Sequence, residues 1–218
     1  PTEPIPPDSP PERPDLTSAP ARSALAGFIL ALGIVLVAIN LRTTIIALPP
    51  FLPIIRDETG LSATATGLLT ALPIMCWATL SLLAPRVARR IGFDWSLIAT
   101  MAMLAAGILI RVIPAIWSLY LGTLVIGVAL ALGNVIAPAS VKRDFPHKPG
   151  VMMSLYGVGM SLGGAIAAAV VMPIHLQGGL SWRATLGLLV IPALLAGIAL
   201  LPRLRMRSLQ AATTTART

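Results

Sequence analysis

The sequence predicts an all-α integral membrane protein with six transmembrane helices, and its composition and hydropathy pattern carry this prediction. Hydrophobic residues make up 56% of the 218 residues, charged residues only 11%, and the mean hydropathy is +0.87. Soluble domains carry about 25% charged residues, so a water-soluble fold of this length could not cover so much apolar surface. Six apolar runs, each close to the roughly 20 residues that span a bilayer core, are too long and too continuous for barrel strands. The chain is therefore expected to form a bundle of helices.

The expected domain organisation is a six-helix transmembrane bundle over residues 25–202 between two tails. Residues 1–24 hold eight prolines and four acids, so they are expected to form a disordered cytoplasmic tail. Residues 203–218 are basic and threonine-rich and are expected to form a second cytoplasmic tail. The helices are expected at about 25–48, 62–84, 95–114, 116–139, 150–173 and 184–202.

Lysine and arginine are unevenly distributed between alternate connections, which predicts the orientation of the helices. Only three basic residues, Arg56, Arg183 and Arg111, fall at or near the external side. The expected protein is a multi-pass protein of the plasma (cytoplasmic) membrane with both termini in the cytoplasm. The net charge of +8 lies in short clusters and not on one face, so no nucleic-acid partner is expected. With the amino terminus inside, twelve basic residues are cytoplasmic: Arg13, Arg22, Arg86, Arg89, Arg90, Lys142, Arg143, Lys148, Arg203, Arg205, Arg207 and Arg217.

The first helix carries polar residues in the middle of its apolar run. A charge at the centre of a spanning helix costs roughly 2.5–3.5 kcal/mol, which makes Arg42 a candidate for function. We expect Arg42 to face a solute cavity, because a guanidinium stays charged and offers a planar fork of donors; the alternative is that it snorkels to the outer interface. Asn40 and Arg42 point about 200° away from each other, so Asn40 is expected to bond neighbouring helices in preference to lining the cavity. Thr43 lies near the Asn40 face.

Three residues in later helices are candidate solute contacts, each with a structural alternative. Asn134 lies deep in the fourth helix, where Pro138 leaves its carbonyl without a donor, and the alternative is an ordinary interhelical hydrogen bond. Arg111, near the outer end of the third helix, is equally well explained by snorkelling. Tyr156 in the fifth helix either lines the cavity or packs against another helix. The predicted solute-binding set is Arg42, Asn40, Thr43, Asn134, Arg111 and Tyr156.

Polar residues and prolines recur at matching places in the two groups of three helices. Asn40 precedes Pro49 and Pro50 in the first helix, and Asn134 precedes Pro138 in the fourth. Interrupted helices in corresponding positions are typical of the inverted repeats of secondary transporters. The sequence therefore predicts an inverted 3+3 repeat.

The segment 85–92 resembles a loop that lies between the second and third helices of the major facilitator superfamily. Arg90 and Gly92 match the motif of this loop, whereas Pro85 stands at its opening glycine and Arg89 at its aspartate. The resemblance implies a gating loop formed by Arg86, Arg89, Arg90 and Gly92.

The fifth helix contains a stripe of small residues. Gly159 and Gly163 are four residues apart, with Ala167 next on the same face, so another helix can approach closely. Packing explains this stripe, and sliding during a conformational change is the functional alternative. Together with Gly164 the two glycines resemble the superfamily's antiporter motif, with Met160 standing at its proline.

Several motifs in order narrow the resemblance to the cyanate permease and 2-nitroimidazole transporter branch of this superfamily. They are Asn40-Leu41-Arg42, Leu72-Pro73, Ala84-Pro85-Arg86, Gly107 with Arg111, Gly133-Asn134 with Pro138, and the segment 141–146. The resemblance covers about residues 25–202 and only the first half of the family's helices. It implies the amino-terminal half of a secondary transporter for a small anionic or polar organic solute, such as a cyanate-like anion, that works by alternating access.

The implied partners are a small-molecule solute, the lipid bilayer, and either a carboxy-terminal half or a second copy of the chain. The alternative function is a truncated or non-transporting six-helix membrane protein with a structural or regulatory role. No Asp or Glu lies within a predicted span, and the sequence has no metal-ligand spacing, nucleophile constellation or phosphate-binding glycine loop. The sequence therefore predicts neither an enzyme nor a cofactor.

Overall fold

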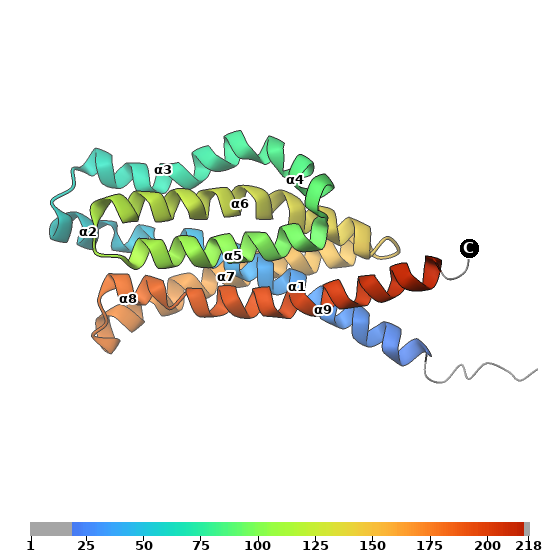
Figure 1. Ribbon diagram of the computed structural model, residues 1–218. Helices are drawn as coiled ribbons and strands as arrows, with labels where there is room; N and C mark the ends of the chain where they lie inside the picture. Colours follow the sequence, from blue (N-terminus) through green and yellow to red (C-terminus); the bar gives the residue numbers. More distant parts are fainter. Residues whose placement is uncertain (1–18, 216–218) are drawn as a thin grey trace, which may run out of the picture.

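A computed structural model arranges the described residues as a bundle of long helices (Figure 1). It describes the backbone of residues 19–215 and the side chains of residues 27–202 and 204. Within these ranges every regular element is a helix. The elements are α1 (Ala19–Ile46), η1 (Pro49–Phe51), α2 (Leu52–Thr59), α3 (Ala63–Leu80), η2 (Ser81–Leu83), α4 (Ala84–Ile91), α5 (Phe93–Val112), α6 (Ile116–Asp144), α7 (Pro149–Gly178), α8 (Trp182–Gly187) and α9 (Val190–Thr215).

Six stretches of these helices are long and apolar enough to cross a membrane. They are Gly27–Thr59, Ala63–Ile91, Phe93–Val112, Ile116–Asp144, Pro149–Gly178 and Trp182–Pro202. The prediction of an all-α protein with six transmembrane helices is confirmed.

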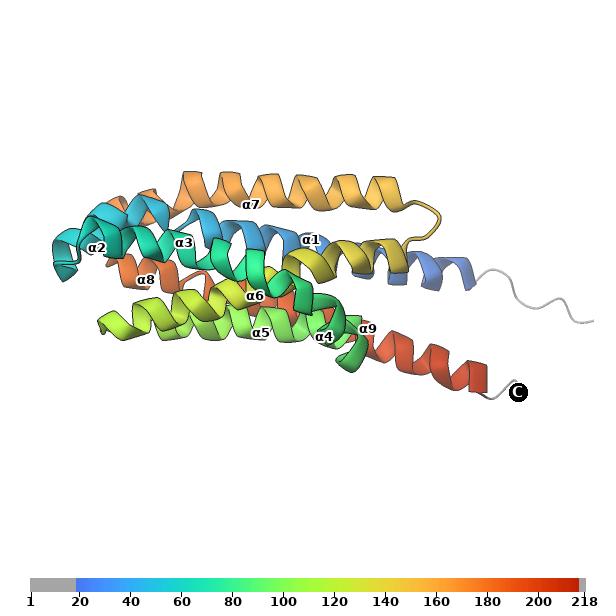
Figure 2. The same ribbon diagram turned by 90° about the horizontal axis from the view of Figure 1, so that it is seen from above.

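The helices are arranged in two layers (Figures 1 and 2). In one layer α6 packs against α3 on one side and α1 on the other, and α1 packs against α7. In the other layer α5 covers the back of α6 and α9 covers the back of α1, and α5 packs against α9. In the repeat, the first span corresponds to the fourth and the second to the fifth, so α1 corresponds to α6 and α3 to α7. The packing of α1 on α7 therefore corresponds to the packing of α6 on α3. This is the pairing expected of an inverted 3+3 repeat.

We call the side of the first layer that points away from α5 and α9 the open face. Most of the exposed apolar side chains of α3 and α7 lie at the edges of the bundle, because each of these helices packs mainly against one neighbour. By contrast, α5 and α6 carry the largest buried fractions. The interior of the bundle is therefore built around α5 and α6, and the open face is where α1 and α6 are uncovered.

The residues expected to form a loop at 85–92 are helical instead. After α3 ends at Leu80, a short 3-10 turn leads into α4, which runs from Ala84 to Ile91. Pro85 lies in the first turn of α4, where the missing N–H of a proline leaves no hydrogen bond unmade. The helix ends at Gly92, whose φ of 84° is a conformation that glycine adopts without a steric penalty.

Other helices are longer than hydropathy predicts. α1 begins at Ala19, inside the expected tail 1–24, and α9 continues to Thr215, through most of the expected tail 203–218. α6 runs to Asp144 with Pro138 inside the helix. The difference arises because hydropathy marks the part of a helix that matches the hydrocarbon core and not the point where helical hydrogen bonding stops. The expected tail residues 1–18 and 216–218 lie outside the described part of the chain.

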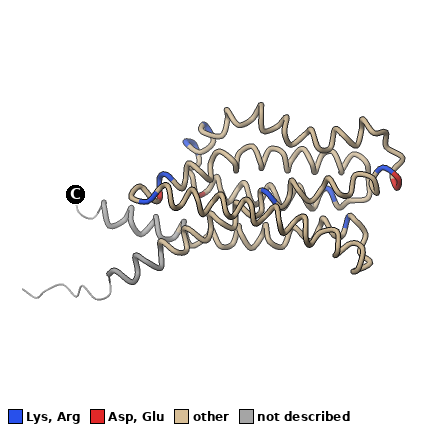
Figure 3. The backbone as a smooth tube through the Cα atoms, turned by 180° about the vertical axis from the view of Figure 1, so that it is seen from behind, with Lys and Arg blue, Asp and Glu red and all other residues tan. Residues whose placement is uncertain are grey.

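Charged residues gather toward the two ends of the bundle (Figure 3). We call the end that holds α4 and the 144–149 connection the basic end, and the opposite end the far end. At the far end, Trp182 Nε1 donates a hydrogen bond of 2.5 Å to Glu58 Oε2 and so ties α8 to α2. The basic end carries Arg86, Arg89, Arg90, Lys142, Arg143 and Lys148.

Candidate functional site

Arg42 lies on the open face, at the border between α1 and α7. The preceding residue, Leu41, is buried against Gly133 of α6, and Arg42 follows it by about 100° around the helix. An added methyl group at Gly164 of α7 would stand 3.7 Å from Arg42 Cγ, so the arginine stem runs beside that glycine. The Arg42 side chain is exposed, and within the described part of the chain it has no hydrogen bond or ion pair. It is available to a solute or a partner on this face.

Asn40 and Thr43 point into the bundle, away from Arg42, as the helix angle predicts. Asn40 is 3% exposed, and its Nδ2 donates to the Leu36 carbonyl of its own helix over 2.8 Å. The hydroxyl of Thr43 lies 2.9 Å from the Gly163 carbonyl of α7 and 2.8 Å from the Ile39 carbonyl, and its one proton is shared between these two acceptors. The interhelical bond expected of Asn40 is therefore made by Thr43 instead.

Asn134 and Tyr156 have separate surroundings. Asn134 is half-buried, and its Nδ2 donates to the Leu130 carbonyl of its own helix, α6, over 2.9 Å. Tyr156 is 8% exposed and belongs to the apolar core that includes Ala38 and Ile34 of α1. These positions place Asn134 in an intrahelical bond and Tyr156 in side-chain packing.

Arg111 is the only arginine buried in the interior among the described side chains, at 2% exposure. Its Nε and Nη2 atoms have no hydrogen-bond partner in the described part of the chain. The side chain lines a pocket of about 130 Å³. Residues of α1, α3 and α6 line the same pocket, among them Thr44, Ile45, Leu69, Thr70, Thr123 and Ile126. The snorkelling alternative is wrong for Arg111, because its guanidinium turns into the bundle and not toward the surface.

The end of α5 explains why Arg111 occupies this position. Ile113 precedes Pro114 and has ψ 131°, because the proline ring excludes the helical conformation from the residue before it. The helix stops directly after Val112, so Arg111 lies in its last turn. One turn earlier, an added methyl group at Gly107 would meet the Gly122 carbonyl of α6 at 2.9 Å. The backbones of α5 and α6 approach each other closely here, so the side chains on this face of α5, including Arg111, lie between helices.

The three arginines expected in a gating loop lie on α4 at the basic end. Arg86, Arg89 and Arg90 are exposed, and they line one open hollow together with Leu83 and Val87. Arg86 Nη1 approaches the Leu82 carbonyl at 3.4 Å. The helix presents these cations to the outside of the bundle, where polar headgroups or solvent can reach them.

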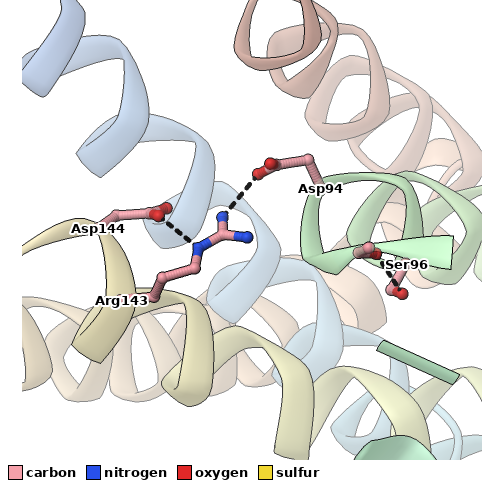
Figure 4. Close-up of polar contacts among 5 residues, drawn as sticks. Asp94, Ser96, Arg143 and Asp144 are labelled. Atoms are coloured by element: carbon pink, nitrogen blue, oxygen red, sulfur yellow. Dashed lines mark hydrogen bonds and ion pairs between the residues drawn. The ribbon is translucent and has the colours of Figure 1, made fainter. Parts of the chain in front are cut away.

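A charge cluster joins α5 to α6 beside Gly92, and the sequence reading did not identify it as a site. Arg143 Nη2 lies 3.0 Å from Asp94 Oδ1, and Arg143 Nε lies 2.7 Å from Asp144 Oδ1 (Figure 4). The Arg143 guanidinium also stacks 4.7 Å from the centre of the Phe93 ring. Next to it, Ser96 donates to the Gly92 carbonyl over 2.6 Å. No local sequence pattern could have found this cluster, because its two helices meet only in the folded bundle.

The glycines of α7 lie against α1. A methyl group at Gly163 would collide with the Ile39 carbonyl, and one at Gly159 would stand 3.2 Å from Ala38 Cβ. Gly164 meets Ile46 and Arg42 in the same way. The small-residue stripe therefore forms the surface on which α1 and α7 pack.

Acidic residues lie at the helix ends in the described part of the chain. Asp57 and Glu58 lie in α2, Asp94 lies in the first turn of α5, and Asp144 is the last residue of α6. Within the same residues, no three His, Cys, Asp or Glu side chains lie together as a metal ion would require. The two arginines inside the spans, Arg42 and Arg111, form no ion pair with a carboxylate in the described part of the chain.

A sequence model described as the Major Facilitator Superfamily matches residues 24–216 of the chain. The chain belongs to the major facilitator superfamily. The six-helix bundle described above corresponds to this family's fold, and the resemblance predicted from the motifs is confirmed.

Individual superfamily members give the same result. The chain is 39% identical over 190 residues to the 2-nitroimidazole transporter of Escherichia coli (strain K12), and the match covers 87% of this chain and 48% of that protein. It is 38% identical over 188 residues to the uncharacterized transporter YycB of Bacillus subtilis (strain 168), covering 86% and 47%. It is 27% identical over 168 residues to the cyanate transport protein CynX of Escherichia coli (strain K12), covering 77% and 44%. The chain spans about half the length of these relatives, which are named as transporters and not as enzymes.

The structure does not bring the predicted solute-binding residues of this superfamily member into one place. Arg111 lines the pocket between α1, α3, α5 and α6, whereas Arg42 lies on the open face. Sequence reasoning did not connect Thr44, Thr70 or Thr123 with Arg111. The signal was present: each threonine lies in the half of its span nearer the far end.

Proposed function

We propose that this chain is the amino-terminal half of a secondary transporter for a small anionic or polar organic solute, and that it works by alternating access. Membership of the major facilitator superfamily and the six-helix bundle support this proposal. Two bundles rock about a site near the middle of the membrane in transporters of this kind. The second bundle would come from a carboxy-terminal half or from a second copy of the chain.

The observation that carries the proposal is the exposed guanidinium of Arg42 on the open face. A charge in the middle of an apolar span is costly, and Arg42 has no partner in the described part of the chain. The open face is the side on which a second bundle can pack, so Arg42 would lie between the two bundles. A solute with oxygen or nitrogen acceptors in one plane would then meet the fork of N–H donors.

The solute class follows from the charge of this site and from the names of the relatives. One relative is named for cyanate and another for 2-nitroimidazole, and both of these molecules are small and carry nitrogen and oxygen acceptors. A cyanate-like anion would be attracted by Arg42, and the acidic side chains of the described chain lie at the helix ends. Asn40, Thr43, Asn134 and Tyr156 would position α1, α6 and α7 around this site, since their polar groups are engaged within or between those helices.

Conformational change would involve two further regions. At the basic end, Arg86, Arg89 and Arg90 on α4 and the hinge at Gly92 would form the gating segment. On the other side of the bundle, the glycines Gly159, Gly163 and Gly164 would let α1 move along α7 with little steric resistance. Both regions lie next to α1, α5 or α6, the helices that surround the two arginines.

The proposed location is the plasma membrane, with both termini and the basic end in the cytoplasm. The bias of lysine and arginine toward one side of the spans supports this orientation. The lipid bilayer is then a partner along the exposed apolar surfaces of α3, α7 and α9.

Uptake of radiolabelled cyanate into proteoliposomes tests the proposal. We expect the chain to accumulate more label than empty vesicles, and Arg42→Ala to lose most of this uptake. Arg56→Ala is the matched control, because Arg56 is an exposed arginine in α2 beside Asp57 and away from the open face. Uptake that Arg42→Ala leaves unchanged would overturn the assignment of the site. If the intact chain does not exceed empty vesicles, this polypeptide alone does not transport, and the structural or regulatory alternative is favoured.

A further inference from the structure

We propose that the pocket around Arg111 is a separate binding site for a small, weakly hydrated inorganic anion, such as nitrate or cyanate. The site lies inside this one bundle and needs no second bundle. It goes beyond the proposed transport function, because Arg42, the residue assigned to the transported solute, is not among the residues that line it. The evidence is the unpaired charge, the geometry of its donors and the chemistry of the walls.

The first argument concerns charge. The Arg111 side chain is 2% exposed, and a guanidinium remains charged at any physiological pH. A buried charge without a partner is strongly unfavourable, so such groups are almost always paired. Nε and Nη2 have no partner among the described residues, and the residues that line the pocket include no carboxylate. A bound anion would supply the missing negative charge.

The second argument concerns the direction of the donors. Nε–H and one N–H of Nη2 lie side by side along one edge of the guanidinium plane. This edge binds two oxygen or nitrogen acceptors in parallel, as it does in bidentate contacts with carboxylate or phosphate. In Arg111 both atoms of this edge lack a partner in the described part of the chain, and the Arg111 side chain lines the pocket. A planar or linear anion with acceptors at its ends fits this arrangement.

The third argument concerns the walls. Three threonines contribute hydroxyl groups, but each of them donates to a carbonyl of its own helix: Thr44 to Asn40 at 2.9 Å, Thr70 to Gly67 at 2.8 Å and Thr123 to Leu119 at 2.7 Å. The remaining walls are aliphatic, so an anion must leave most of its hydration shell outside. Weakly hydrated anions lose less on entering such a site than sulfate or phosphate.

The size of the pocket sets a limit on its ligand. Its volume of about 130 Å³ exceeds what one water molecule needs and accommodates an anion of a few heavy atoms. Thr44 and Ile45 of α1 form one wall, whereas Arg42 is not among the lining residues. The two arginines therefore serve two different sites.

Thermal unfolding of the purified chain in detergent tests this site without any transport measurement. Cys76 is a free, buried thiol, and its reaction with a fluorogenic maleimide reports unfolding. Sodium nitrate is the probe, and sodium gluconate and sodium sulfate at equal ionic strength are the references. We expect nitrate to raise the midpoint of unfolding in a saturable manner, with no comparable rise in gluconate or sulfate.

Two variants and one control complete the experiment. Arg111→Met removes the charge and keeps the volume, and Thr70→Leu keeps the charge and fills the pocket; we expect both to abolish the nitrate-dependent rise. Arg42→Gln should retain the full rise, which separates this site from the proposed solute site. A nitrate effect that is absent in the native chain, or equal in the native chain and Thr70→Leu, overturns the proposal. Failure of cyanate uptake in proteoliposomes leaves this test unaffected.

Discussion

Gly122 of α6 lies directly against the backbone of Arg111. A methyl group added at position 122 would stand 2.6 Å from the Arg111 amide nitrogen and 2.8 Å from its Cβ. The Arg111 side chain therefore starts between α5 and α6, with backbone packed on backbone. The glycine determines that this arginine is enclosed in the bundle, and the adjoining pocket depends on the same close approach.

We predict that Gly122→Ala destabilises the protein by about 1–3 kcal/mol, because the α5 backbone cannot give way as a flexible side chain could. Thermal unfolding in detergent would measure the loss. Gly67→Ala is the control, since nothing lies within 4 Å of the added methyl group at position 67. A Gly122→Ala variant as stable as the Gly67→Ala variant would contradict the close contact between α5 and α6.

We predict a similar loss, about 1–3 kcal/mol, for Gly163→Ala. The added methyl group would collide with the Ile39 carbonyl, separate α7 from α1 and lengthen the bond from Thr43 to the Gly163 carbonyl. The same unfolding assay applies. Gly157→Ala on the same helix has free space around the methyl group and should change stability little. Equal stability of the two variants would show that α1 and α7 do not pack through this stripe.

We predict that Arg143→Gln destabilises the basic end by about 1–3 kcal/mol, because it removes the cation that joins Asp94 to Asp144. The double variant with Asp94→Asn should be less destabilised than the sum of the two single variants, since each single variant already removes the ion pair between Arg143 and Asp94. Unfolding midpoints of the four proteins give this coupling. Arg89→Gln, an exposed arginine of α4, is the matched control and should be nearly neutral. Strictly additive effects would rule out a coupled pair.

We predict that the basic end faces the cytoplasm. In a Cys76→Ser background, a membrane-impermeant maleimide added to intact cells should label Thr64→Cys and not His147→Cys. Both positions are exposed, Thr64 at the far end and His147 between α6 and α7. Permeabilised cells provide the control, in which both variants should react. Labelling of His147→Cys alone in intact cells would reverse the proposed orientation.

Hydropathy and charge were enough to predict six helices, and the resemblance of the motifs predicted the superfamily. A spanning helix must be apolar over a fixed length, so the local sequence is enough to predict it. Its ends are less well determined, because hydropathy falls where the helix leaves the hydrocarbon core, whereas helical hydrogen bonding continues beyond that point. This is why the structure has helix in three stretches that hydropathy did not assign to a helix: 85–91, α6 beyond residue 139 and α9 beyond residue 202.

The features of the candidate sites also fall into two groups: those that the local sequence determines and those that depend on how the helices pack. The opposite directions of Asn40 and Arg42 follow from helical geometry alone, since two residues on one helix have a fixed angle between them. The burial of Arg111 and the pairing of Arg143 with Asp94 depend on which helices become neighbours. Contacts between residues far apart in the chain, such as Gly122 against Arg111 across two helices, are decided only when the bundle packs. The sequence of one helix determines the direction of each side chain around the helix axis. It does not determine which residue of another helix that side chain contacts.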